Sequence, residues 1–409
     1  MNSARLGEST KEEIVFVRGI MTRKPSIMLI GLGNLGSIIL EFLAREKSLG
    51  RIVVADQDTA RSIARSNLAR LSAMAQGFSP SIFFTPLDIN DKKTVEEIVS
   101  RESPDIIITT ATMQTWWLPD LLPPEKSTII KSAGFGVWLP VHLTLTMKLM
   151  EALNDIDYGG ITLTAPFPDV VNCILGHLNL APTCGVGNLE EIVPKLRALA
   201  AERLKVPLDL IQVQLVAHHA LETMAFGEQA KEIPPYFLRI EKDGEDITKE
   251  VEGDKLLFAP YPLPPGPAIH FLTAGTAVRL IKAFFSEDEV LIHAPGPKGL
   301  PGGYPVIVGR RGIKLAPIKG ISLEESVSIN ERSHRFDGIE KVENDGTVVF
   351  CPEAAEIIRS EIGYECTRLS PREAEERAKE LIARFKEYAR RQGIELNHSG
   401  GDVYAFKDR

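Results

Sequence analysis

The chain has 409 residues, a net charge of −8 and 44% hydrophobic residues. At roughly 100–200 residues per domain this length predicts two or three domains, and the composition excludes a disordered or fibrous chain. The acidic balance disfavours partners with a negative surface. We therefore expect no binding to nucleic acid or to a membrane surface.

The four cysteines are far apart and form no CxxC pair, which disfavours a zinc ribbon or a thioredoxin-like site. Few cysteines in a chain of this size are typical of a reducing compartment. Residues 1–13 are charged and contain no apolar signal segment, and no stretch of 18 apolar residues follows. We expect a cytoplasmic protein with no membrane span and no metal site.

The first half alternates strands with helices. Apolar runs predict strands over 26–30, 52–55, 81–86, 105–110, 127–132 and 160–164, and periodic segments predict helices over 38–44, 58–74, 91–101, 141–153 and 169–178. Such alternation is typical of a doubly wound parallel sheet with helices on both faces. We place this α/β domain at residues 1–182.

The pattern changes after residue 182. Helices are expected over 189–204, 273–285 and 371–391, strands over 209–217, 291–293 and 305–308, and a hairpin over 236–247 and 250–258. Ser370 and Glu373 have the spacing of a capping box for the last helix. The mixed order predicts an α+β domain at residues 183–409, which we expect to be the substrate or catalytic domain.

A glycine motif lies between the first predicted strand and helix. Gly31, Gly33 and Gly36 form GxGxxG, and Asp56 ends the next strand 20 residues later. This context indicates a dinucleotide-binding Rossmann domain, in which the helix N-terminus binds the pyrophosphate and the acid accepts ribose hydroxyls. The expected cofactor residues are Gly31, Gly33, Asn34, Leu35, Gly36, Asp56, Thr110 and Ala111.

Asp56 also bears on the choice of cofactor. A carboxylate at this position repels a 2′-phosphate and therefore favours NAD. Arg61 and Arg65 lie one turn apart on the following helix and could instead bind such a phosphate. NAD is the expected cofactor, and NADP stays open.

From about residue 141 onward, the order of several segments resembles the lactate/malate dehydrogenase superfamily. The segments are 164–172 (TAPFPDVVN), 185–191 (GVGNLEE), 195–206 (KLRALAAERLKV), 214–219 (QLVAHH), 304–314 (YPVIVGRRGIK) and 321–325 (ISLEE). Residues 127–153, with the glycine loop 131–136, and the loop 109–114 look more like saccharopine-dehydrogenase-type Rossmann domains. Residues 326–365 look like an insertion, so the resemblance is to a divergent branch.

The resemblance implies a catalytic histidine. It aligns His219 with the group that exchanges the hydroxyl proton, and His218 is one residue off. Because neighbouring strand residues face opposite sides, only one of the two should enter the cleft. A carboxylate orients this histidine in the family, and Glu190 or Glu191 occupies that region here. Either could equally be a solvated carboxylate at the helix N-terminus.

The family's clamp for a carboxylate substrate is largely replaced. Ala165 stands where the family has Asn, and Lys195 and Gln114 stand where it has two arginines. Lysine cannot reproduce the planar fork of arginine, so a simple 2-hydroxy acid is not the expected substrate. The residues expected on the substrate side are Gln114, Trp117, Lys195 and His270.

These observations lead to an NAD(P)-dependent oxidoreductase that transfers a hydride to or from a small organic substrate, in a homo-oligomer. Two other functions stay open. One is an NAD-dependent, redox-cycling hydrolase or lyase of the glycosidase type, which would need a metal held by a Cys and a His, with Cys184 near the required loop. The other is a dinucleotide-binding sensor without chemistry. Metal content and turnover distinguish these functions.

Overall fold

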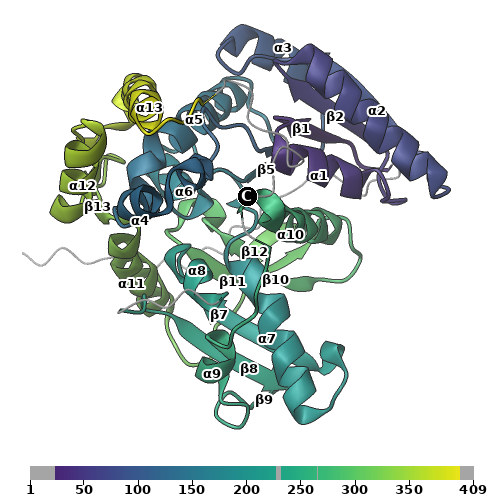
Figure 1. Ribbon diagram of the computed structural model, residues 1–409. Helices are drawn as coiled ribbons and strands as arrows, with labels where there is room; N and C mark the ends of the chain where they lie inside the picture. Colours follow the sequence, from purple (N-terminus) through teal and green to yellow (C-terminus); the bar gives the residue numbers. More distant parts are fainter. Residues whose placement is uncertain (1–23, 227–231, 265, 397–409) are drawn as a thin grey trace, which may run out of the picture.

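The computed structural model describes residues 24–226, 232–264 and 266–396 (Figure 1). Residues 1–13, examined above for a signal segment, lie outside this range. The first half forms a six-stranded parallel sheet in the order β3-β2-β1-β4-β5-β6. The strands are β1 (Ile27–Ile30), β2 (Arg51–Asp56), β3 (Ser81–Pro86), β4 (Ile106–Thr109), β5 (Ile161–Thr164) and β6 (Cys184–Gly185). The order confirms the predicted doubly wound sheet.

Both faces of the sheet are covered by helices. Side chains alternate along β1, so that Met28 and Ile30 enter one hydrophobic cluster while Ile27 and Leu29 enter another. The helices that pack on the sheet are α1 (Asn34–Leu43), α2 (Thr59–Ala75) and α10 (His270–Ala283) on one side, and α3 (Lys92–Glu102), α5 (Leu139–Asp155) and α6 (Pro168–His177) on the other. Burial on both faces explains why these strands are almost continuously apolar.

The second half is α+β, as predicted. Two of its three antiparallel three-stranded sheets among the described residues have the orders β7-β8-β9 and β10-β11-β12. Their strands are β7 (Ile211–Val216), β8 (Phe237–Lys242), β9 (Glu245–Asp246), β10 (Val290–Pro295), β11 (Gly303–Gly309) and β12 (Gly312–Leu315), accompanied by α7 (Leu189–Leu204), α8 (Ala220–Ala225), α9 (Gly253–Leu257) and α11 (Leu323–Ser333). The 3₁₀ helices of the chain are η1 (Leu118–Leu121), η2 (Phe135–Trp138), η3 (Leu208–Leu210), η4 (Gly266–Ile269), η5 (Pro297–Gly299), η6 (His334–Asp337) and η7 (Pro371–Glu373).

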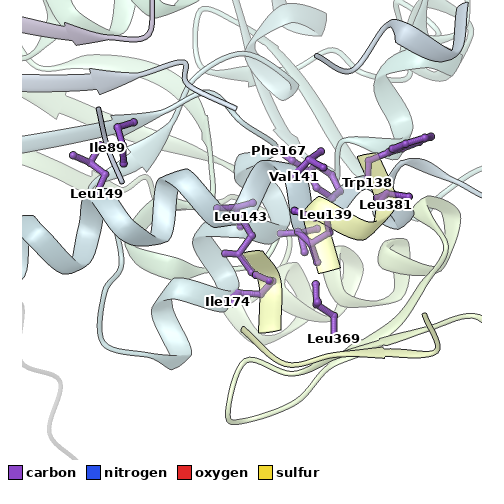
Figure 2. Packing of buried hydrophobic residues seen from close by; sticks show 14 of the residues in the cluster. Ile89, Trp138, Leu139, Val141, Leu143, Leu149, Phe167, Ile174, Leu369 and Leu381 are labelled. Atoms are coloured by element: carbon purple, nitrogen blue, oxygen red, sulfur yellow. The ribbon is translucent and has the colours of Figure 1, made fainter. Parts of the chain in front are cut away.

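The C-terminal segment returns to the first half of the chain. It contains β13 (Ile339–Val342), β14 (Val348–Phe350), α12 (Pro352–Ile362), β15 (Arg368–Leu369) and α13 (Ala374–Arg391). Figure 2 shows Leu369 and Leu381 of this segment beside Leu139 and Trp138, and the Trp138 and Phe385 rings meet edge to face at 4.9 Å. The hydrophobic cluster therefore crosses residue 182, and the division into domains at that residue stays a prediction.

Three local predictions are wrong. Residues 127–132 are not a strand but part of helix α4 (Pro124–Lys131), where the buried Ser127 and Ile130 share one helical face. A short apolar run cannot be assigned by periodicity alone. Residues 250–258 form a turn and helix α9 instead of a second hairpin strand. Ser370 makes no side-chain cap bond, whereas a capping box is present at Ser322 and Glu325.

No helix among the described residues is both long enough and apolar enough to cross a bilayer.

Candidate active site

A cavity of about 1210 Å³ opens at the carboxyl edge of the parallel sheet. The ends of β1, β2, β4 and β5 reach it, together with the start of α7, the start of α8, residues 263–264 and 266–273, and η6. In an open parallel sheet this edge is where ligands bind. We call the part near the β1–α1 turn the cofactor end and the part near His219 the acid–base end.

At the cofactor end, the backbone of the glycine turn lies in close contact with neighbouring segments of the chain. Gly31 has φ +90°, and a Cβ there would lie 2.8 Å from the backbone nitrogen of Ala111. A Cβ on Gly36 would collide with the Gly31 carbonyl oxygen, so Gly36 permits contact between helix and strand and does not line the cavity. Gly33 lines the cavity and would meet no atom within 4 Å. Of the other predicted cofactor residues, the ones that line the cavity are Gly31, Asn34, Leu35, Asp56, Thr110 and Ala111.

Asp56 ends β2 at the wall of the cavity. Its carboxylate accepts hydrogen bonds from the backbone N–H groups of Leu32 (2.6 Å) and Asp58 (2.8 Å), and Arg61 lies 3.5 Å away. The acid is therefore held beside the glycine turn. The first turn of α1 carries no acidic side chain that would oppose the binding of a phosphate at the helix N-terminus. These features fit the adenosine and pyrophosphate groups of a dinucleotide.

His219 lies at the acid–base end. It follows β7 and is the N-cap residue of α8, and its backbone N–H donates to Asp169 Oδ1 at 3.0 Å. The ring packs against two aromatic residues, with centroid distances of 4.8 Å to Phe135 and 5.2 Å to Phe167. His219 lines the cavity, and its acid–base role stays a prediction.

The carboxylate that orients His219 is Asp337. His219 Nδ1 lies 3.0 Å from Asp337 Oδ2 and 3.2 Å from Oδ1. Asp337 belongs to η6, within the segment expected to be an insertion. Glycine allows this approach: a Cβ on Gly134 or Gly136 would overlap the Asp337 backbone, and one on Gly338 would overlap Ala133. The glycine loop 131–136 thus seats the η6 turn against the site.

The contacts of His219 shift its protonation. Burial opposes the charged ring, but the negative charge of Asp337, its hydrogen bond, and the charges of Glu222 and Asp169 outweigh this and raise the pKa of His219 to about 9. Although burial acts in the opposite direction, the two histidines beside Asp337 lower its pKa below the ordinary value. Nδ1 is engaged with Asp337, which leaves Nε2 as the ring nitrogen available for proton exchange.

His218 lies behind Asp337 and does not line the cavity. Its Nδ1 is 3.1 Å from Asp337 Oδ2, and its ring meets His334 edge to face. Only one of the two neighbouring histidines lines the cavity, as predicted. Both nevertheless reach one carboxylate, because the strand ends at Val216 and strict alternation stops there.

The two glutamates proposed to orient His219 lie elsewhere. Glu190 is outside the cavity wall, where it pairs with Arg279 and accepts the His293 backbone N–H at 2.8 Å. Glu191 lines the cavity but contacts Glu222, one turn after His219, instead of the His219 ring. Burial, and then the charge of Glu222, raises the pKa of Glu191 well above its ordinary value.

The predicted substrate residues divide into two groups. Gln114 and His270 line the cavity, whereas Lys195 and Trp117 do not. The Lys195 ammonium donates to the backbone carbonyls of Ala225 and Leu257, the latter at 2.8 Å. Lys195 therefore joins α7 to α8 and α9 and cannot replace a substrate-binding arginine.

The tryptophan at the cavity is not the predicted Trp117 but the residue before it. Trp116 lines the cavity, and its indole N–H donates to His270 Nε2 at 3.0 Å. Burial lowers the pKa of His270 to about 4, so this ring is neutral near pH 7 and its proton lies on Nδ1. Consecutive residues of the loop point in different directions, and nothing in the sequence indicated which one faces the cavity.

Cys184 does not lie at the cavity. It is fully buried in β6 within the hydrophobic cluster of the sheet, and burial raises the pKa of its thiol. Within residues 24–226, 232–264 and 266–396, no three His, Cys, Asp or Glu side chains are grouped to hold a metal ion. The metal-ligand role that the glycosidase hypothesis gives to Cys184 therefore has no support in its position.

Comparison with known proteins shows the fold. No family model matches the chain, and no curated protein matches its sequence. Among solved structures, lactate dehydrogenase from Eimeria maxima with NADH and oxamate is similar at 15% identity and TM-score 0.51, over 78% of this chain and 94% of that one. Malate dehydrogenases from Cryptosporidium parvum (15%, TM-score 0.53, 76% and 96%) and Plasmodium falciparum (15%, TM-score 0.52, 82% and 99%) are also similar. At these identities the likeness shows the fold alone, and it is the lactate/malate dehydrogenase fold that the sequence resemblance implied.

Proposed function

We propose that this protein is an NAD-dependent oxidoreductase that interconverts an alcohol and a carbonyl group in a small organic substrate. The observation that carries the proposal is one continuous cavity, with the glycine turn and Asp56 at one end and the His219–Asp337 pair at the other. The solved lactate dehydrogenase of the same fold that was determined with NADH adds support for the cofactor.

The chain's residues would divide the work as follows. Gly31, Gly33 and the N-terminus of α1 bind the pyrophosphate, and Asp56 accepts the ribose hydroxyls. When bound, NAD supplies a hydride acceptor for alcohol oxidation, and NADH supplies a hydride donor for the reverse reaction. His219 Nε2 accepts the hydroxyl proton during oxidation and returns it during reduction, while Asp337 fixes the ring orientation.

The pKa of about 9 sets the protonation state of His219 near neutral pH. Below this pKa the ring is an imidazolium and can donate a proton, which suits carbonyl reduction. Oxidation requires the neutral ring, so its rate rises with pH until about 9 and then levels off. We therefore propose that the enzyme works mainly as a reductase near pH 7.

Cofactor titration tests the first half of this proposal. We expect NADH to bind more tightly than NADPH, because Asp56 repels a 2′-phosphate. Equal or tighter binding of NADPH would contradict the role of Asp56 and would indicate that Arg61 and Arg65 bind the 2′-phosphate. Tight binding of NADH without turnover of any alcohol or carbonyl compound would instead support the alternative function, a dinucleotide-binding sensor without chemistry.

Location and assembly are further parts of the proposal. The four cysteines are free thiols, which supports the reducing environment of the cytoplasm.

Large apolar side chains are exposed on α2 and on the edge strand β3, among them Leu68 (58%), Leu71 (64%) and Phe83 (48%). Such a surface supports a homo-oligomer. Light scattering on the purified protein measures its mass, and a monomer would contradict this part.

A further inference from the structure

Carboxyl groups dominate the charge of the acid–base end. Glu191 lies in the first turn of α7 and Glu222 lies in α8, and both line the cavity. Each of the two carboxyl groups shifts the pKa of the other, which places them close together. Among the described residues no Lys or Arg forms an ion pair with either of them. A buried carboxyl group, Glu191, and a half-buried one, Glu222, therefore line this end of the cavity without a Lys or Arg partner among the described residues.

The environment of this pair favours a protonated carboxyl group. Burial is the largest cause that raises the pKa of both groups, and their mutual repulsion adds to it for Glu191. His219, beside Glu222 on α8, lowers the pKa of Glu222, whereas the charges of Asp169 on α6 and Asp337 on η6 raise it. A cation placed between the two glutamates would favour their ionised forms and displace that proton.

Two further acceptors face the same cavity without a partner. Gln114 Oε1 and His142 Nε2 are buried and make no hydrogen bond among the described residues, and the two residues are only 8% and 3% exposed. The Thr112 hydroxyl donates to a backbone carbonyl and lies 3.2 Å from His142 Nδ1. It therefore accepts the Nδ1 proton, and Nε2 is a bare acceptor. Buried acceptors left unsatisfied are costly, which points to a ligand that supplies donors.

We propose that the Glu191–Glu222 pair binds an ammonium group of the substrate, so that the substrate is an amino alcohol and its oxidised product an amino ketone. This assignment rests on the proposed function, which supplies the redox step. An ammonium group has three N–H donors and one positive charge, and it matches two carboxyl groups and nearby acceptors. It takes no part in bond making or breaking.

The same residues argue against an anionic substrate. A substrate carboxylate at this position would face Glu191, Glu222 and Asp337, and like charges raise the free energy of binding. Lys195, the cation at the aligned family position, is occupied by two backbone carbonyls outside the cavity. This end of the cavity thus carries negative charge, whereas a site that binds the carboxylate of a 2-hydroxy acid needs a positive charge.

Three probes that differ in one group test the inference. They are 1-amino-2-propanol, 1,2-propanediol and lactate, which carry an ammonium, a hydroxyl and a carboxylate on the same carbinol. We would measure their binding to the full-length protein by titration calorimetry, with and without NADH, in two buffers of different ionisation enthalpy. We expect the amino alcohol to bind at least ~10-fold more tightly than the diol, with release of a proton, and lactate to bind weakest.

Variants separate this inference from the proposed function. Glu191→Gln and Glu222→Gln should each reduce the preference for the amino alcohol about tenfold, and Glu191→Gln should abolish the proton release. Glu202→Gln, an exposed change on the same helix, is the matched control and should behave as the parent protein. His219→Asn should retain amino alcohol binding while losing turnover.

The outcomes are distinct. If the diol or lactate binds as tightly as the amino alcohol, or if the glutamate variants keep the preference, the inference is overturned. The proposed function would survive that result if any of the three probes reduced NAD. Conversely, tight binding of the amino alcohol to a protein that binds neither NADH nor NADPH would uphold the ammonium site and overturn the proposed function.

Discussion

The two ends of the cavity are built on different principles. The cofactor end uses backbone N–H groups and one carboxylate, and its main parts lie within the stretch from Gly31 to Asp56. The acid–base end uses side chains from α6, α7, α8 and η6, so that Asp169 and Asp337 meet at one histidine across a separation of 168 residues (337 − 169). A backbone site is sensitive to the shape of the chain, whereas a side-chain site is sensitive to charge and protonation.

Removing the acid–base group should have the largest effect. His219→Asn keeps a polar side chain of similar size but cannot exchange a proton, so we expect turnover to fall by roughly 10²–10⁴. NADH affinity should change less than about twofold, because the ring lies at the other end of the cavity. Stopped-flow turnover and a fluorescence titration measure the two quantities. His218→Asn is the control, and a larger loss of activity in that variant would show that the neighbouring histidine is the acid–base group.

The contact between His219 and Asp337 can be removed without changing His219 itself. Asp337→Asn removes the charge that raises the pKa of His219, so that pKa should fall from about 9 towards the ordinary 6.5 or below, since burial lowers it. The acid limb of the oxidation profile should then move to lower pH by about 2.5 units or more. We expect a fall in the maximal rate of roughly 10–100-fold, because the ring is no longer oriented. An unchanged pH profile would mean that Asp337 only supports the fold.

The same contrast explains what could be predicted from sequence. The sheet, the glycine turn and Asp56 were foreseen because each signal lies within a few residues. Asp337 was missed, since no local pattern marks an acid that reaches the site from a segment expected to be an insertion. The glycine loop 131–136 and Gly338 were the available hint, because glycines can mark close contact between chain segments.

Glu222 and Lys195 illustrate the two kinds of error at the site. Glu222 lies three residues after His219, and a helical assignment of residues 220–225 would have placed both on one face. No element was assigned there, so the acid was overlooked. Lys195 was placed at the substrate by alignment with an arginine, but the chain uses its ammonium to satisfy two backbone carbonyls. Position along a helix alone does not show whether a cation is already paired.

At the cofactor end, shape should matter more than charge. Gly33 has φ −70° and ψ −159°, which alanine can adopt, and its Cβ would meet no protein atom. Gly33→Ala should therefore leave the melting temperature unchanged, while its methyl group projects towards the pyrophosphate position and weakens NADH binding about tenfold or more. Gly36→Ala is the paired variant. Its Cβ collides with the Gly31 carbonyl, so it should lower the melting temperature as well.

The smallest expected effect is that of charge at the cofactor end. Arg61 lies 3.5 Å from Asp56 and partly offsets its charge. Arg61→Ala should therefore leave NADH binding within about twofold and weaken NADPH binding by roughly fivefold, the upper range for a single exposed ion pair. The difference should shrink as salt is added, because the Debye length is only about 10 Å at 0.1 M ionic strength. Arg65→Ala, whose guanidinium donates to the Leu32 carbonyl, provides the comparison. If Arg61→Ala weakened NADH and NADPH equally, Arg61 would be binding a phosphate common to both cofactors, and charge would matter at this end of the cavity as it does at the other.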